Sequence, residues 1–236
     1  MLDHSNKWIK SKSIKYRKEL GQYFTPDNIK DKLLELLPKM ENAKILEPSI
    51  GTGEFVDGIY RNFKNCTIDA YDIDEDILNL IPNSINKVCK SFLEIEPIKK
   101  YDYIIGNPPY GTECKEISKK FNDIISGRVN IYALFIRHAL NFLKDDGYLA
   151  FVVPTSMNNG KYFAKLRSYI VGGFEVENII NFKDDEFIDA QQNVQIIIIK
   201  KSPNTGKNIF KWRDEVYFTK DYKKMYLLSK GKLTLK

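Results

Sequence analysis

The sequence has few of the residues that bind metals or form disulfides. Among 236 residues there are three cysteines and two histidines, His4 and His138. Cys66, Cys89 and Cys114 are far apart, and no CxxC pair or histidine cluster completes a zinc site. An odd number of scattered cysteines also argues against a disulfide framework, so we interpret them as reduced structural thiols. A metal-dependent mechanism is disfavoured.

Long apolar runs and a strong charge of one sign are also lacking. No apolar stretch approaches the roughly 18 residues needed to cross a bilayer, and Met1–Lys10 lacks the apolar centre of a signal peptide. We therefore expect a protein without a membrane partner that stays inside the cell, in the cytoplasm or with the nucleoid. The formal net charge is +6, from 37 Lys+Arg and 31 Asp+Glu. This mild excess permits a polyanionic partner without demanding one.

The chain does have enough apolar side chains for one large core, with 43% hydrophobic and 13% aromatic residues. Patterns of strand type alternate with patterns of helix type, which is typical of an α/β fold with a doubly wound, mostly parallel sheet. The predicted strands are Lys44–Leu46, Thr67–Tyr71, Tyr103–Ile105, Tyr148–Val153, Glu177–Asn181 and Val194–Lys200. The predicted helices are one from Pro26 that Pro38 closes, with Thr25 as its N-cap, and Glu54–Phe63, Glu75–Leu80, Ile131–Leu143 and Tyr162–Ile170.

Composition divides the chain into three regions. Residues 1–20 form a basic extension in which cationic side chains surround Trp8 and Tyr16, and we favour a solvated tail over an arm that contacts phosphates. Residues 21–201 hold all the predicted strands and form the main domain. Residues 202–236 are polar and lysine-rich, and are interpreted as a tail or as the truncated start of a further domain.

The first motif with chemical meaning is ILEPSIGTGEF, from Ile45 to Phe55. A predicted buried strand runs into Gly51 and Gly53, and a helix begins near Glu54. Glycines at such a turn let the backbone approach a ligand, and the free amides of a helix N-terminus bind polar groups. Because the motif lacks the Lys-Ser/Thr ending of an ATP phosphate loop, it indicates another nucleotide-type ligand.

A carboxylate follows at the spacing expected for a ribose contact. Asp72 comes directly after the predicted strand Thr67–Tyr71 and lies 19 residues beyond Gly53, where an acidic side chain accepts hydrogen bonds from ribose hydroxyls. Sites for NAD and for S-adenosylmethionine share this arrangement. A helix-capping aspartate is the simpler alternative.

A third motif, Gly106-Asn107-Pro108-Pro109-Tyr110, follows the predicted strand Tyr103–Ile105. The two prolines restrict the backbone at the carboxyl end of a strand, where such sheets place active sites. The Asn107 side-chain oxygen and the Pro108 carbonyl are two acceptors for the N–H groups of an exocyclic amino group. Binding both would free its lone pair for methyl transfer from a sulfonium. Tyr110 offers a ring on which a planar base stacks, and a tight structural loop is the alternative.

Four segments in this order resemble the adenine-N6 DNA methyltransferases of restriction-modification systems, in their gamma arrangement: LGQYFTP (Leu20–Pro26), ILEPSIGTGEF, YDID (Tyr71–Asp74) and IIGNPPY. The resemblance covers about Leu20 to Lys201. It implies a Rossmann-like, S-adenosylmethionine-dependent methyltransferase domain over 21–201, with S-adenosylmethionine as cofactor and no metal. It also implies double-stranded DNA as the partner, with the target adenine flipped out of the helix.

The resemblance further implies roles for individual residues. Tyr23, Phe24 and Thr25 match the segment that closes over the methionine end of the cofactor. The other cofactor-binding matches are Glu47, Ser49, Gly51 and Gly53 in the glycine turn, Asp72 at the ribose, Ile73 and Phe92 at the adenine, and Asn107. The catalytic matches are Asn107, Pro108, Pro109 and Tyr110, and Phe187 matches an aromatic residue that packs on the flipped base. Ser91 stands where the family commonly has an aspartate, so Ser91 or a backbone carbonyl would accept the bond from the cofactor's adenine.

Several alternatives stay open. The loop from Gly111 to Arg128, with Lys115, Lys119 and Lys120, either contacts phosphates or forms a solvated helix. NPPY also occurs in methyltransferases that act on adenine in RNA or on the glutamine amide of release factors, although the FTP segment favours DNA. A catalytically weak subunit is another alternative. Family members usually carry a large target-recognition domain after the catalytic sheet, whereas about 35 residues follow Lys201. A partner subunit or a further domain is therefore expected to read the DNA sequence.

Overall fold

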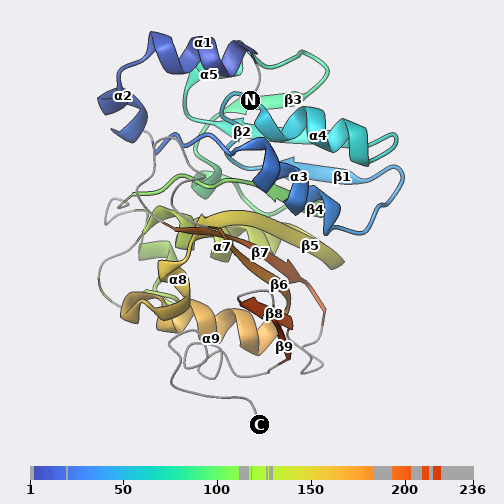
Figure 1. Ribbon diagram of the computed structural model, residues 1–236, viewed down its shortest axis with the longest axis vertical. Helices are drawn as coiled ribbons and strands as arrows, with labels where there is room; N and C mark the ends of the chain where they lie inside the picture. Colours follow the sequence, from blue (N-terminus) through green and yellow to red (C-terminus); the bar gives the residue numbers. More distant parts are fainter. Residues whose placement is uncertain are drawn as a thin grey trace.

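The structure is a computed structural model that describes residues 3–19, 21–111, 117, 119–125, 127, 130–182, 193–202, 209–212 and 215–218. Its centre is a seven-stranded sheet in the order β3-β2-β1-β4-β5-β7-β6 (Figure 1). β7 runs antiparallel to both neighbours, and the remaining pairs are parallel. The predicted α/β sheet, doubly wound and mostly parallel, is confirmed. The strands are β1 (Lys44–Glu47), β2 (Thr67–Asp72), β3 (Asn86–Cys89), β4 (Tyr101–Gly106), β5 (Leu143–Pro154), β6 (Glu175–Phe182) and β7 (Val194–Lys200).

Helices cover both faces of the sheet. β1 connects through α4 to β2 on one side, whereas β4 connects through α7 to β5 on the other; because such crossovers are right-handed, these two helices lie on opposite faces. The helices are α1 (Asp3–Ser11), α2 (Ile14–Glu19), α3 (Asp27–Glu35), α4 (Glu54–Asn62), α5 (Glu75–Leu78), α7 (Ile131–Ala139), α8 (Ser156–Asn159) and α9 (Ala164–Gly173). Short 3₁₀ turns are η1 (Phe92–Glu94), η2 (Lys119–Phe121), η3 (Leu140–Phe142) and η4 (Lys161–Phe163), and β8 (Ile209–Trp212) pairs with β9 (Glu215–Phe218) in a separate sheet.

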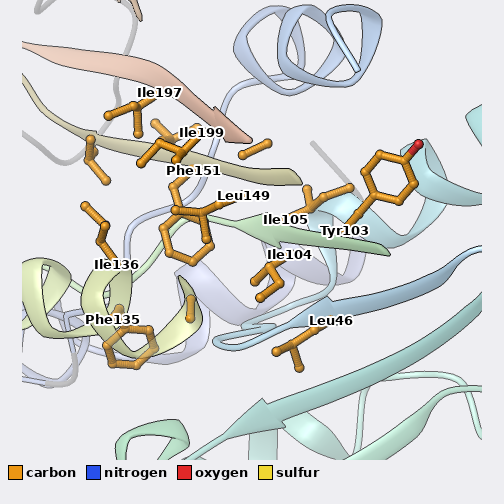
Figure 2. Close-up of a cluster of buried hydrophobic side chains, with 14 of the residues drawn as sticks. Leu46, Tyr103, Ile104, Ile105, Phe135, Ile136, Leu149, Phe151, Ile197 and Ile199 are labelled. Carbon is orange, nitrogen blue, oxygen red and sulfur yellow. The ribbon is translucent and has the colours of Figure 1, made fainter. Parts of the chain in front are cut away.

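The core lies between these helices and the central strands. Figure 2 shows side chains of β1, β4, β5, β7 and α7 gathered in one cluster. The four isoleucines at 196–199 of β7 are fully buried, as predicted for a strand covered on both faces. At about 1.5 to 3 kcal/mol for each fully buried side chain of this size, these four alone contribute several kcal/mol of hydrophobic stabilisation.

Most predicted elements are present, with shifted ends. β7 has the predicted bounds, and β1, β2, β4 and β6 extend the predicted strands by one to three residues. β5 begins at Leu143, five residues before the predicted start, because its first residues pair with Tyr101 of β4. The helix expected over Tyr162–Ile170 is instead η4 followed by α9, and the helix expected to reach Leu143 ends at Ala139. β3 was not predicted, since Asn86–Cys89 contains only one strongly strand-forming side chain, Val88.

The N-terminal region is not the solvated tail that its charge predicts. Residues 3–19 form α1 and α2, and Trp8 of α1 is 7% exposed because it packs with Phe24 and Ile77. Figure 1 shows α1 lying over α5, where Lys12 forms an ion pair with Asp76 (3.0 Å). The tail interpretation is therefore wrong for these residues. The alternative of a phosphate-contacting arm stays a prediction.

The predicted N-cap at Thr25 is also wrong. α3 begins at Asp27 with Pro26 in the N-cap position and without a side-chain cap. The Thr25 hydroxyl instead accepts a hydrogen bond from the side-chain amide of Asn107 (3.2 Å). A side chain that looked like a local helix signal thus makes a long-range contact with another motif.

The histidine and the cysteines that the structure describes are not arranged as a metal site. His138 is buried, its Nε2 lies 2.9 Å from the Ile95 carbonyl oxygen, and burial lowers its pKa, in keeping with the packing role expected from its helix position. Cys66 and Cys89 are free thiols, and Cys114 lies outside the described residues. Over the ranges that the structure describes, no helix is long and apolar enough to span a membrane, and no group of three or more His, Cys, Asp or Glu side chains is arranged to hold a metal ion.

Candidate cofactor and methyl-transfer site

A cavity of about 480 Å³ opens at the carboxyl ends of β1, β2 and β4. The strand order reverses between β1 and β4, which is where doubly wound sheets bind their ligands. The cavity brings together most residues that the sequence singled out. They are Tyr23, Phe24, Thr25, Glu47, Ser49, Gly51, Asp72, Ile73, Ser91, Phe92, Asn107, Pro109 and Tyr110.

Three predicted residues are not part of this lining. Gly53 begins α4 as its N-cap with a left-handed φ of 77°, and a Cβ there would lie 2.9 Å from the Ile81 side chain, so the turn requires glycine. Pro108 is buried beside the cavity. Phe187 lies outside the described residues.

Asp72 braces the glycine turn. Its Oδ2 accepts a hydrogen bond from the Gly51 amide (2.8 Å), and its Oδ1 accepts one from the Asp74 amide (3.0 Å). Burial raises the pKa of Asp72, although these backbone bonds oppose the shift. The helix cap of α5 is Asp74, whose side chain accepts from the Ile77 amide. Helix capping, which was the alternative role for Asp72, is therefore performed by Asp74.

Two buried glutamates carry oxygens that lack hydrogen-bond partners within the described structure. Glu47 is 1% exposed with Oε2 unpaired, and Glu54 is 5% exposed with both carboxylate oxygens unpaired. Burial, together with the charges of Asp72 and Glu54, holds the pKa of Glu47 well above its usual value. A buried carboxylate without a partner is costly, so this wall of the cavity suits a cationic group. Glu54 was missed as a site residue, although its place directly after the glycine turn was a signal.

Asn107 is fixed so that its side-chain oxygen remains available. The amide nitrogen donates to the Tyr23 carbonyl oxygen (2.9 Å) and to the Thr25 hydroxyl (3.2 Å). Because a backbone carbonyl only accepts hydrogen bonds, these contacts set which side-chain atom is nitrogen and which is oxygen. Asn107 Oδ1 is buried and has no partner among the described groups. The site therefore presents one oriented acceptor.

The ring of Tyr110 lines the same cavity and is held on several sides. It stacks on Tyr23, with ring centroids 5.0 Å apart, and meets the edge of Tyr132 at 6.1 Å. Its hydroxyl donates to the Val152 carbonyl oxygen (3.2 Å). Burial raises the pKa of Tyr110 well above 10, so the phenol stays protonated and keeps this bond.

The far side of the cavity offers apolar contacts and one hydroxyl. Ile73 is 55% exposed, which is unusual for a large aliphatic side chain and leaves it open to a ligand ring. Phe92 lines the cavity while also packing against the rings of Phe135 and Phe142. Ser91 and Lys90 also line the cavity.

Comparison with known proteins identifies the family of the chain. The Eco57I restriction-modification methylase family matches residues 52–188. Modification methylase CviBIII of Paramecium bursaria Chlorella virus NC1A is 31% identical over 208 residues, which are 83% of this chain and 53% of that protein. The chain thus spans about half the length of this curated relative.

Solved structures share the fold. A proposed class I S-adenosylmethionine-dependent methyltransferase from Listeria monocytogenes superposes with a TM-score of 0.66 at 24% identity, covering 77% of this chain and 62% of that one. The methyltransferase subunit of a type I restriction-modification system from Streptococcus thermophilus gives 0.67 at 15% identity, covering 90% and 53%. The fold is that of S-adenosylmethionine-dependent methyltransferases, and the family match shows that the chain belongs to the Eco57I restriction-modification methylases.

Proposed function

We propose that this chain transfers a methyl group from S-adenosylmethionine to the N6 amino group of adenine in DNA. The observation that carries the proposal is Oδ1 of Asn107, which is buried and has no hydrogen-bond partner among the described residues. Its direction is set by the amide nitrogen of the same side chain, which donates to Tyr23 and Thr25. Family membership supports the cofactor and the reaction class. Adenine and DNA as the target rest on the motif order and on the family.

The residues around the cavity fit this cofactor. The oxygens of Glu47 and Glu54 that find no partner in the described part of the chain suit its ammonium group, and Asp72 suits the ribose hydroxyls. Thr25 accepts from Asn107 through oxygen, so its hydroxyl proton remains to be donated to the cofactor carboxylate. Ile73 and Phe92 offer apolar contact to the adenine ring. When bound, the cofactor supplies a methyl group made electrophilic by its sulfonium.

The protein's part in the transfer is to orient the acceptor nitrogen. Asn107 Oδ1 and the Pro108 carbonyl accept hydrogen bonds from the two N–H groups of the target amino group. These two bonds turn the lone pair of the amino nitrogen out of conjugation with the adenine ring. Fixed dipoles act strongly in a buried site, and losing one such acceptor typically costs 10²- to 10³-fold in rate. No side chain needs to remove the proton beforehand, because the methylated nitrogen becomes acidic and releases it to water.

A base inside a duplex does not reach this cavity, so we propose that the target adenine is flipped out. The adenine is proposed to stack on the ring of Tyr110. In the structure, the ring of Tyr23 stacks against one side of the Tyr110 ring. Phe187 is proposed to pack on the base from the other side. Residues 202–236 or a partner subunit are proposed to read the sequence of the DNA, since type I relatives of this fold are named as subunits.

The test is incubation with isotopically labelled S-adenosylmethionine and separate DNA, RNA and release-factor substrates. Digestion followed by mass spectrometry is expected to find the label as N6-methyladenine in DNA. Label only in RNA or in a glutamine amide would overturn the DNA assignment and favour the alternative substrates. The matched control is Asn107→Ala, which we expect to bind the cofactor but to transfer methyl at least about 10²-fold more slowly.

A further inference from the structure

The N-terminal helices are joined to the cofactor cavity by hydrogen bonds as well as by packing. Ser5 of α1 is fully buried, and its hydroxyl donates to the Thr52 hydroxyl (2.9 Å) in the middle of the glycine turn. Trp8 packs on Phe24 and Ile77, both of which line the cavity. Residues 3–19, which we call the N-terminal strap, thus contact two walls of the site.

Two side chains, Gln22 and Tyr16, connect this strap to Asp74. Gln22 Oε1 accepts from the indole Nε1 of Trp8 (3.3 Å), and Gln22 Nε2 donates to Asp74 Oδ2 (2.9 Å). The same Asp74 oxygen accepts from the Tyr16 hydroxyl of α2 (3.0 Å). Through the Asp74 amide, which bonds to Asp72, the path continues to the glycine turn.

The segment that carries Gln22 lies directly against the methyl-transfer motif. At Gly21, where φ is +64°, an added Cβ would meet Pro109 Cβ at 2.8 Å and the Tyr110 carbonyl oxygen at 3.0 Å. On the other side of Gln22, the Tyr23 carbonyl accepts from Asn107 (2.9 Å). A shift of the backbone at residue 22 therefore moves one of the groups that orient Asn107.

We infer that Gln22 is a positioning residue, which ties the N-terminal strap to Asp74 and thereby holds residues 21–25 where they orient Asn107. This inference rests on the proposed function for its catalytic readout. A glutamine suits the position because it accepts from an indole N–H on one side and donates to a carboxylate on the other. A carboxylate in its place would still accept from Trp8 but would repel Asp74. An apolar side chain would take this acceptor away from the Trp8 indole and would remove one of the hydrogen bonds that Asp74 accepts, leaving the one from Tyr16.

The inference is tested with Gln22→Leu and Gln22→Glu in the full chain. For Gln22→Leu we expect kcat to fall at least tenfold, while the dissociation constant for S-adenosylmethionine changes less than threefold. Trp8→Phe keeps an aromatic ring in the strap and removes only the indole donor, so a smaller fall in kcat in the same direction is expected. The control is Lys12→Ala. Lys12 belongs to the same strap and forms an ion pair with Asp76 of α5, and its removal should leave kcat unchanged.

The Gln22→Glu variant supplies a readout that loss of stability does not. Asp74 faces residue 22, and the other charged groups nearby are Asp72, Asp76 and Lys12. The Tyr16 phenol keeps its proton, because its pKa is raised above 10. As pH falls, the new carboxyl of residue 22 takes up a proton and restores a donor to Asp74. As the pH is lowered from 8 to 5.5, the ratio of the kcat of Gln22→Glu to that of the wild type is expected to rise. The same ratio for Gln22→Leu is expected to stay constant.

Hydrogen exchange separates failure of this inference from failure of the proposed function. Mass spectrometry is expected to show faster exchange of the amides in residues 21–25 in Gln22→Leu, whether or not the wild type methylates DNA. Unchanged exchange together with unchanged kcat would overturn the positioning role. A wild type that leaves DNA adenine unmethylated while exchange still responds to Gln22→Leu would overturn the proposed function and keep the structural link.

Discussion

The rings of Tyr110 and Tyr23 lie 5.0 Å apart at an interplanar angle of 23°, a stacked pair built from two distant motifs. One residue follows β4 and the other precedes α3, so the pair joins the methyl-transfer motif to the segment beside the cofactor cavity. Tyr110 has a second tie through its hydroxyl, which donates to the Val152 carbonyl. Ring and hydroxyl therefore have separable consequences.

Removing the hydroxyl and removing the ring should affect different measurements. Tyr110→Phe keeps the ring and removes one buried hydrogen bond to the Val152 carbonyl. We therefore expect a melting temperature lower by about 2 to 4 °C per kcal/mol lost, with methyl transfer within threefold of wild type. Tyr110→Ala also removes base stacking worth roughly 1 to 3 kcal/mol, which predicts a loss of about 5- to 150-fold in kcat/KM for DNA. Equal inactivity of the two variants would show that the hydroxyl, not the ring, matters to transfer.

Gly21→Ala tests how closely the segment 21–25 fits the methyl-transfer motif. The left-handed backbone disfavours alanine by about 1 to 2 kcal/mol, and the new methyl group meets Pro109 at 2.8 Å. We expect a lower melting temperature and at least a tenfold fall in kcat. The matched control is Gly172→Ala in α9, where nothing lies within 4 Å of an added Cβ, and where alanine should stabilise the helix slightly. Wild-type turnover in Gly21→Ala would contradict the fit.

The fold could be predicted where side-chain periodicity reflects burial. The run at Val194–Lys200 predicted β7 with its bounds because every position except its last is buried. β3 escaped prediction because it is an edge strand whose residues are mostly exposed, so burial imposes no apolar pattern on it. The start of β5 was missed because Asp145, Asp146 and Gly147 look like a turn, and Asp146 does adopt a positive φ of 60°.

The cavity could be predicted where a motif carries its own spacing, as with Gly51, Asp72 and Asn107. The links between motifs could not, because they depend on contacts across the fold. Thr25 looked like a helix cap, yet its hydroxyl meets Asn107. The packing of the strap on the domain was not predicted, because its many lysines are typical of a solvated segment. The signal for it was Trp8, a large apolar side chain in a basic segment, which is buried in the structure.

Glu54 is expected to contribute to cofactor affinity through the ammonium group. Its carboxylate is buried, unpaired within the described structure and part of the cavity lining. Hydrogen bonds to charged groups are worth about 1.5 to 3 kcal/mol, so Glu54→Gln should weaken S-adenosylmethionine binding about tenfold or more. Isothermal titration calorimetry measures this directly. The control ligand is 5′-methylthioadenosine, which lacks the amino-acid group and should bind both proteins alike; an equal loss for both ligands would contradict the assignment.

Glu47 should make the stability of the cofactor-free protein depend on pH. Burial and the charges of Asp72 and Glu54 hold its pKa in the folded state well above the ordinary 4.5. Below pH 4.5 the carboxyl is protonated in both the folded and the unfolded chain. As pH rises past 4.5 only the unfolded chain releases this proton, so stability falls by up to about 1.4 kcal/mol per pH unit until the folded pKa is passed.

Glu47→Gln removes this titration and isolates its effect. Without cofactor, we expect the variant to match the wild type near pH 4 and to melt at a higher temperature at pH 7, because no buried carboxyl has to stay protonated or ionise alone. With S-adenosylmethionine the order should reverse, since the ionised carboxylate pairs with the ammonium group and its affinity rises with pH. Thermal melting from pH 4 to pH 8, with and without cofactor, checks both signs. A variant that is less stable than the wild type at every pH without cofactor would show that Glu47 supports the fold rather than the ligand.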